Sequence, residues 1–258
     1  MINNENSQGR ACYNNGKLPS ETKRCTLTTL DKNVLWYLIG YTYADGCITI
    51  SDNRYYVQWK SKDLDLITYV KEVLGTDCKI QISEGKYYVL SIGSKSLVME
   101  FMAYGIIPRK TYSTIYPTVD INYFSDFTRG YFDGDGSVSV RMEKDKKYLQ
   151  VQFVNKLKEN LQSFGNILKE ELGLIPLIHQ HEESYRLSYT LHASLSLYWY
   201  MYGKCSTFFL SRKRDVFETW LRERNQLNFA RRTCEKCGNE YSMLHDKSRV
   251  CHKCKMKI

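Results

Sequence analysis

Two segments of the chain share one pattern of hydrophobic and polar positions. Residues 34–50 (VLWYLIGYTYADGCITI) and 126–140 (DFTRGYFDGDGSVSV) each contain an apolar helical run that stops at Asp-Gly and continues directly into a strand. Glycine adopts positive φ without steric cost, so we expect Gly46 and Gly136 to end the two helices in a left-handed turn. The pattern predicts the same helix–strand unit twice.

A hairpin of two alternating strands follows each Asp-Gly and has one apolar and one polar face. The apolar positions of the two hairpins are Ile48, Ile50, Val57 and Trp59 in the first, and Val138, Val140, Met142, Leu149, Val151 and Phe153 in the second. Each hairpin leads into an amphipathic helix, at 62–75 and at 158–173, and then into two short strands and a further helix. This order predicts an α/β (α+β) fold made of two pseudo-symmetric αββαββα halves with antiparallel sheets.

Small residues four positions apart lie on one face of a helix. Both apolar helices contain such a pair, Gly40 with Ala44 and Gly130 with Gly134. Small residues allow two helix backbones to approach closely, as they do between membrane helices. We therefore expect the two helices to pack side by side through these four positions.

Helices packed in this way would bring Asp45 and Asp135 together at their C-terminal ends. A helix C-terminus carries partial negative charge, which disfavours a carboxylate by about 0.3–1 kcal/mol, and a second carboxylate adds repulsion. Divalent cations bound by oxygen ligands remove both penalties. The alternative is that Asp-Gly only terminates each helix, but the occurrence of the same arrangement twice favours a pair of metal ligands.

The two motifs also resemble a known family. The nonapeptides LIGYTYADG (38–46) and TRGYFDGDG (128–136) resemble the two motifs of the LAGLIDADG homing endonucleases, and the resemblance extends over roughly residues 30–225. Tyr43 stands where the family name has Asp, at a position that varies in the family. The acid before the final glycine is present in both copies, as Asp45 and Asp135.

The resemblance implies a function for these acids. In the family they bind divalent metal, usually magnesium, between the scissile phosphates of double-stranded DNA, and each half supplies a saddle-shaped sheet that lies in the major groove. A chain with two motifs is then expected to act as a monomer that makes site-specific double-strand breaks. Lys110 and Lys213 occupy matching basic turns, 107–111 and 210–214, and resemble the basic residues that flank the metals in the family. Each could instead be a simple phosphate contact.

The polar faces of the two hairpins contain side chains that can hydrogen-bond to base edges in the major groove. These candidate DNA-binding residues are Arg54, Gln58, Lys60, Arg141, Gln150 and Gln152. Any single one of them could equally be solvated or contact a phosphate.

Four cysteines near the end of the chain have the spacing of a metal site. Cys234-x-x-Cys237 and Cys251-x-x-Cys254 are separated by 13 residues, which is typical of a tetrahedral structural zinc site in a small zinc ribbon. Redox-active CxxC pairs, or His245 and His252 as substitute ligands, are the alternatives. We expect this tail to extend the DNA footprint; a protein contact or a purely structural role is the alternative.

Composition and charge agree with a nucleic-acid partner. The chain has 258 residues, is 43% hydrophobic and carries a formal charge of +9, which excludes a disordered protein and suits binding to a polyanion. Residues 212–258 contain 13 Lys and Arg against 6 Asp and Glu, so the tail holds most of the positive excess. We expect an N-terminal arm at 1–27, the two halves at 28–120 and 121–228, and the zinc-ribbon-like tail at 229–258.

No stretch reaches the roughly 18 apolar residues of a membrane span, and the polar start lacks the apolar segment of a signal peptide. We therefore expect a cytoplasmic location, with a phage gene acting in a bacterial host as one origin and an organelle as the alternative location. A second class of function is an intron maturase that binds RNA, or a DNA-binding regulator that does not cleave. An intein is disfavoured because no splicing block flanks the repeats.

Overall fold

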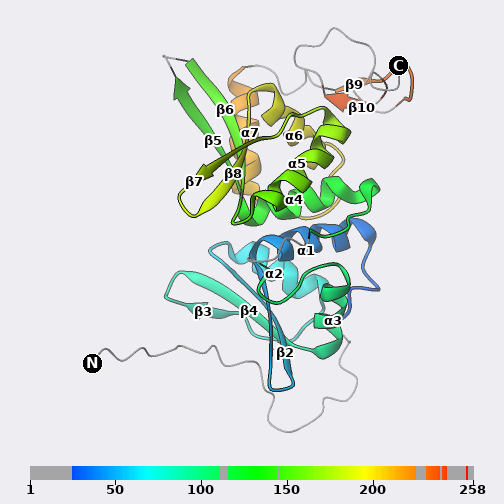
Figure 1. The fold of residues 1–258 in the computed structure, drawn as a ribbon, viewed down its shortest axis with the longest axis vertical. Coiled ribbons are helices and arrows are strands. Elements are labelled where there is room, and N and C mark those ends of the chain that lie inside the picture. The colour runs from blue at the N-terminus through cyan, green and yellow to red at the C-terminus, as the bar shows by residue number, and fades with distance from the viewer. Residues whose placement is uncertain are drawn as a thin grey trace. The chain divides into compact units, whose positions relative to one another are not determined.

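The computed structural model describes residues 25–110, 116–143, 146–224, 231–238, 240–242 and 254. The chain forms two compact units, which Figure 1 shows with their elements labelled. The first contains residues 45–108 and the described residues up to Leu30, and the second contains residues 31–44 and those from Arg109 onward. No helix in the described part of the chain is long and apolar enough to cross a membrane.

The first unit is a four-stranded antiparallel sheet with two helices. Its strands are β1 (Gly46–Ser51), β2 (Arg54–Ser61), β3 (Gln81–Ser83) and β4 (Tyr87–Gly93), in the spatial order β1-β2-β4-β3. Helices α2 (Leu64–Val73) and α3 (Lys95–Ala103) pack on the sheet. The rings of Trp59 on β2 and Phe101 on α3 meet edge to face with their centroids 5.8 Å apart, and both side chains are fully buried. The apolar strand face is therefore the core of this unit.

The second unit contains the two motif helices and a second four-stranded sheet. Helix α1 (Lys32–Asp45) packs with α4 (Phe124–Asp135), which follows the short helix η2 (Ile121–Tyr123). Strands β5 (Gly136–Glu143), β6 (Lys146–Asn155), β7 (Leu177–His181) and β8 (Ser184–Thr190) are in the order β5-β6-β8-β7. Helices α5 (Lys158–Leu172), α6 (His192–Tyr202) and α7 (Ser211–Glu223) complete the layer, and the hairpin β9 (Arg231–Thr233) with β10 (Glu240–Ser242) contacts α6.

The duplicated fold predicted from the sequence is confirmed. Each half follows the order αββαββα, and the two sheets have the same strand order and the same register. Gly46 pairs with Trp59 as Gly136 pairs with Phe153. The polar faces correspond as well, because Gln58 pairs with Ser91 and Gln152 pairs with Ser188.

Two local expectations were wrong. Neither Gly46 nor Gly136 has a positive φ, and Gly136 is extended, with φ −81° and ψ 155°. A Cβ at Gly136 would lie 2.5 Å from the carbonyl oxygen of Phe132, so the position requires glycine for close approach and not for a left-handed turn. The second basic turn, 210–214, is instead the start of α7, because Leu210 accepts the first hydrogen bonds of that helix.

The apolar face of the second hairpin is buried over only part of its length. Leu149 and Val151 are fully buried, whereas Val140 and Met142 are 44% and 61% exposed. The far ends of β5 and β6 project past the helices that cover the rest of the sheet (Figure 1). The alternation of residue types along a strand predicts on which face of the sheet a side chain lies. It does not predict whether a helix covers that part of the face.

Candidate active site

Helices α1 and α4 meet backbone to backbone at two glycines. A Cβ at Gly40 would overlap the carbonyl oxygen of Phe127, and a Cβ at Gly130 would overlap that of Tyr37. Next to these positions, Ala44 is buried and Gly134 is half-buried. The close crossing fixes the register of the two helices and hence the place where each of them ends.

A pocket of about 290 Å³ lies at the end of α4 in the second unit. Its lining residues are Tyr43, Ala44, Lys110, Asp135, Val154, Asn155, Lys156 and Ser184. Asp135 reaches solvent here, yet the surrounding protein displaces enough water to raise its pKa, while Lys110 and Lys213 act in the opposite direction. A carboxylate that is exposed to a pocket and partly desolvated by the surrounding protein is a suitable ligand for a divalent cation.

Asp45 occupies the equivalent position in the first motif. It is the last residue of α1 and is half-buried, and β1 begins at the next residue. Asp45 belongs to the first compact unit and Asp135 to the second. The pairing of these two acids around metal stays a prediction.

Lys213 is bound to the end of α4. Its side chain is only 6% exposed. The ammonium group donates hydrogen bonds of 2.6–3.2 Å to backbone carbonyl oxygens of α4 and of the residue that follows it, namely those of Phe132, Asp133, Gly134 and Gly136. A helix leaves its last carbonyl groups without intrahelical partners, and a cation at this end interacts favourably with the helix dipole. Lys213 is therefore a C-terminal cap for the helix that carries Asp135.

Lys110 is the matching lysine of the first motif, and it binds the end of α1. Its ammonium group donates a hydrogen bond of 2.8 Å to the carbonyl oxygen of Ala44. Unlike Lys213, Lys110 is half-buried and lines the pocket beside Asp135. Of the two lysines, Lys110 is thus the one that a ligand in the pocket can contact.

Asp133 is a buried carboxylate two residues before Asp135. One of its oxygens accepts hydrogen bonds from the Tyr37 hydroxyl at 2.8 Å and from the Leu210 backbone N–H at 3.0 Å. Burial raises the pKa of Asp133 to about 6, although Lys213 and the Tyr37 hydroxyl both act to lower it. This residue connects α4 to α1 and to the start of α7.

Among the pocket residues that the sequence interpretation missed are Asn155 and Lys156. Asn155 is the last residue of β6; its side-chain oxygen accepts a hydrogen bond from Leu157 N–H at 3.0 Å. The strand register places Asn155 close to the motif, because Gly136 pairs with Phe153. Counting across the hairpin from Asp135 would have identified this strand end as part of the site.

The polar face of the second sheet consists of rows of paired residues. Gln152 lies between Ser137 and Ser188, and Gln150 lies between Ser139 and Thr190. The exposed Arg141 donates a hydrogen bond from its Nε to Gln150 at 3.2 Å. Gln152 differs from the other candidates because it is 8% exposed and its amide nitrogen donates to the Ser188 hydroxyl at 2.9 Å.

A further row on this face contains an arginine that the sequence interpretation missed. Arg186 on β8 pairs with Val154 on one side and with His179 on the other. It is half-buried, and among the described residues its Nε has no hydrogen-bond partner. Alternation along the segment SYRLSYT assigns Arg186 and Ser188 to the polar face, so the same pattern rule would have found them.

The polar face of the first sheet contains the other three candidates. Gln58 lies between Cys47 and Ser91, the place that Gln152 occupies in the second sheet. Two cations on β2 pair with carboxylates, Arg54 with Asp52 at 3.4 Å and Lys60 with Glu84 at 2.7 Å. Both cations are about half exposed at the side chain, so these ion pairs can be exchanged for contacts with an anionic ligand.

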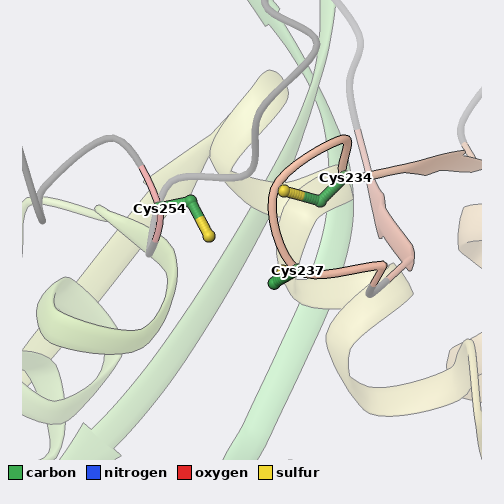
Figure 2. Close-up of side chains that lie close together, drawn as sticks. All are labelled: Cys234, Cys237 and Cys254. Carbon is green, nitrogen blue, oxygen red and sulfur yellow. The ribbon is translucent and has the colours of Figure 1, made fainter.

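Three cysteines converge near the end of the chain. The sulfur atoms of Cys234, Cys237 and Cys254 all lie within 4.8 Å of one another, and Figure 2 shows Cys254 facing the loop that carries the other two. The loop is a tight turn in which Gly238, at φ 68°, donates its N–H to the Cys234 carbonyl at 2.8 Å. Tetrahedral zinc with bonds of about 2.3 Å places thiolate sulfurs about 3.8 Å apart, so this cluster fits zinc. Cys251 lies outside the described residues.

Comparisons with known proteins agree with the motif resemblance. Residues 125–232 match the family described as a LAGLIDADG-like domain. No curated protein sequence matches the chain significantly.

Several solved structures have a similar fold, among them that of a LAGLIDADG homing endonuclease. A mutant of I-SmaMI is 14% identical with a TM-score of 0.57, over 76% of this chain and 93% of that one. The LAGLIDADG homing endonuclease I-GzeII in complex with its DNA target is 14% identical with a TM-score of 0.54, over 78% of this chain and 94% of that one. Variants of the homing endonuclease I-DmoI are 19% identical with a TM-score of 0.53, over 73% and 98%. At these identities the likeness shows the fold.

Proposed function

Because the chain contains a LAGLIDADG-like domain and has the fold of the LAGLIDADG homing endonucleases, we propose that it is a site-specific endonuclease that makes double-strand breaks in DNA by metal-dependent phosphodiester hydrolysis. The observation that carries the proposal is the position of Asp135, which lies at the end of the tightly packed helix α4 and lines a pocket together with Lys110 and Asn155. In the proposal one chain binds its target as a monomer, since it contains both motifs.

The residues that line the pocket are chemically suited to phosphodiester hydrolysis. Asp135, and Asp45 from the first unit, would hold divalent cations, with magnesium as the expected metal. A bound cation supplies an activated water and neutralises charge on the attacking and leaving oxygens. Desolvation raises the pKa of Asp135, so the carboxylate is stabilised when a cation binds.

The two lysines have different tasks in this proposal. Lys213 is buried against backbone carbonyls of α4 and its neighbouring residue, which favours support of the helix end over direct contact with a phosphate. Lys110 lines the pocket and can approach a phosphoryl oxygen, where a cation would stabilise developing negative charge. Asn155 is a candidate to orient water or phosphate in the same pocket.

The polar faces of the two sheets are the proposed surfaces for reading the DNA. Arginine and glutamine side chains on strands can form paired hydrogen bonds with guanine and adenine edges in the major groove. Gln58 and Gln152 occupy matched positions in the two sheets, which supports equivalent readers in both halves. The exposed arginines on these faces, Arg54 and Arg141, add electrostatic attraction to the phosphate backbone.

The C-terminal cysteines form the proposed structural zinc site. Cys234, Cys237 and Cys254 would supply three thiolates, and Cys251 is the fourth ligand indicated by the spacing. Since β10 contacts α6, the zinc-bound hairpin would be attached to the second half and not suspended on a free linker.

A plasmid assay tests the proposed function. Wild-type protein with magnesium is incubated with supercoiled plasmid that carries DNA from the insertion locus of its own gene, and the expected product is linear DNA cut at one site. Asp45→Asn and Asp135→Asn should each reduce cleavage by several orders of magnitude while binding in calcium is retained, because each change removes one anionic metal ligand without changing size. Asp65→Asn, at an exposed position of α2, is the matched control.

The outcomes separate the classes of function. If the wild type binds the locus DNA but leaves it uncut, the regulator alternative is supported. If it binds the intron RNA in preference to DNA and cuts neither, the maturase alternative is supported. Linear product at the wild-type rate from either motif variant would disprove the role of the two acids.

A further inference from the structure

Helices α4 and α7 cap each other. Lys213 in the first turn of α7 donates hydrogen bonds to carbonyls at the C-terminal end of α4. In return, Asp133 near that end of α4 accepts the N–H of Leu210, the residue that precedes α7. Leu210 has no side-chain group that could cap its own helix, so Asp133 supplies an acceptor that capping residues usually provide. Each charge lies at the favourable end of the partner helix, the cation at the C-terminus of α4 and the anion at the N-terminus of α7, although each lies at the unfavourable end of its own helix.

The mutual cap formed by Asp133, Leu210 and Lys213 is called the joint below. Tyr37 links this joint to the crossing of α1 and α4. Its hydroxyl donates to the same Asp133 oxygen that Leu210 binds, and both Tyr37 and Asp133 are almost fully buried. Tyr37 lies three residues before Gly40, and its own carbonyl contacts Gly130. One carboxylate therefore connects α1, α4 and α7 at a point two residues from Asp135.

Among the described residues, the first motif shows no equivalent of this joint. The pseudo-symmetry that matches Gly40 with Gly130 also matches Tyr37 with Phe127 and Asp133 with Tyr43. Phe127 and Tyr43 form an aromatic contact with their centroids 6.0 Å apart, and Tyr43 packs edge to face on Tyr131 at 5.3 Å. An aromatic ring fills the space but accepts no backbone N–H, so within the described part of the chain the hydrogen-bonded joint is found at the second motif.

We propose that Asp133 is a positioning residue that holds Lys213 on the end of α4 and thereby sets the place of Asp135, and that Lys110 in the first motif is held independently of it. The catalytic consequence rests on the proposed function, whereas the geometric consequence does not. Without the acceptor at Asp133, the start of α7 loses a fixed point, and Lys213 can leave the carbonyls that it caps. The acid at the end of α4 then faces the pocket in a wider range of orientations.

Lysine labelling tests the geometric consequence without requiring activity. The full chain is treated with an amine-acylating reagent, and the labelling rates of Lys213 and Lys110 are measured by peptide mass spectrometry. In Asp133→Ala we expect the Lys213 rate to rise about tenfold or more, the change that corresponds to one lost charged hydrogen bond, while the Lys110 rate stays within about twofold. Asp133→Asn keeps an accepting oxygen and should restore most of the protection.

A second variant keeps the test decisive if Asp133→Ala does not fold. Leu210→Pro removes the donor N–H and leaves Asp133 in place, and the φ of −74° at Leu210 is compatible with proline. Because the Leu210 side chain is buried, Leu210→Ala, which keeps the N–H, is the matched control. It should also expose Lys213 to labelling. Unchanged Lys213 labelling in a folded variant, or an equal rise at Lys110, would overturn the inference.

Cleavage kinetics test the catalytic consequence. Asp133→Ala should reduce the cleavage rate about tenfold, with nicked plasmid accumulating, while DNA affinity in calcium stays within about twofold and Asp133→Asn recovers the rate. If the wild type does not cleave, the proposed function fails and the labelling result still decides the joint. If the wild type cleaves and the folded Ala variant cuts at the same rate with the same affinity, the positioning role fails and the proposed function stands.

Discussion

Gly130 of α4 is in direct contact with the backbone carbonyl of Tyr37 in α1. A Cβ at Gly130 would overlap that carbonyl oxygen and would lie 2.8 Å from the backbone nitrogen of Tyr41. The reverse contact exists at Gly40, which meets the carbonyl of Phe127. Backbone atoms cannot rotate away as a flexible side chain can, so these two glycines set the distance between the motif helices.

Gly40→Ala and Gly130→Ala should therefore each destabilise the protein by about 1–3 kcal/mol or more, because the added methyl group forces the helices apart. Urea unfolding monitored by circular dichroism measures the change. Gly93→Ala is the control, since the nearest atom to a Cβ there belongs to the side-chain ring of Tyr56 at 3.1 Å, and the nearest backbone atom, the Tyr55 oxygen, is 4.0 Å away. Equal midpoints for the three variants would show that the helix crossing tolerates a wider separation.

The fold could be predicted from the sequence because its signals are local. Asp-Gly after an apolar helix and period-two strands occur twice, and a duplicated pattern strongly restricts the topology. The joint around Asp133 could not be predicted in the same way. Tyr37 and Asp133 are 96 positions apart, and their hydrogen bond depends on how the two helices cross. The capping role of Lys213 could not be predicted either. A basic turn and a basic first turn of a helix have the same sequence pattern, and only the start of α7 in the structure distinguishes them.

Removal of the Lys213 charge should cost more stability than removal of the Lys110 charge. Lys213→Met leaves several carbonyls near the end of α4 without their donor in a buried place, for an expected loss of about 3 kcal/mol or more. Lys110→Met affects a half-buried side chain, for which the loss should be about 1 kcal/mol. Urea unfolding of both variants checks the order. A larger loss for Lys110→Met would contradict the different tasks assigned to the two lysines.

The cysteine cluster should bind one zinc ion per chain. Elemental analysis of purified protein measures the stoichiometry, and Cys234→Ser or Cys254→Ser should abolish binding, while Cys47→Ser on the exposed face of β1 should not. Chelation of the zinc should also lower the thermal unfolding midpoint, because β10 contacts α6 and metal binding contributes to folding free energy. Less than about half an equivalent of zinc in protein purified without chelator would rule out the site.

Arg186 should read a base, whereas Lys158 should contact phosphate. Arg186 lies on the polar face of the second sheet, half-buried beside His179, and its Nε is without a hydrogen-bond partner among the described residues. Arg186→Ala should weaken binding to the target by about 1–3 kcal/mol and reduce discrimination at one base pair. Lys158 is exposed at the start of α5, so Lys158→Ala should weaken binding to all sequences alike and make the salt dependence shallower by about 0.9 in the slope of log affinity against log salt. Fluorescence anisotropy in calcium, with the target and a set of single-base variants at several salt concentrations, separates the two effects. If Arg186→Ala weakened every sequence equally and changed the salt slope, Arg186 would be a phosphate contact, and base reading would have to be assigned to other residues of the sheet.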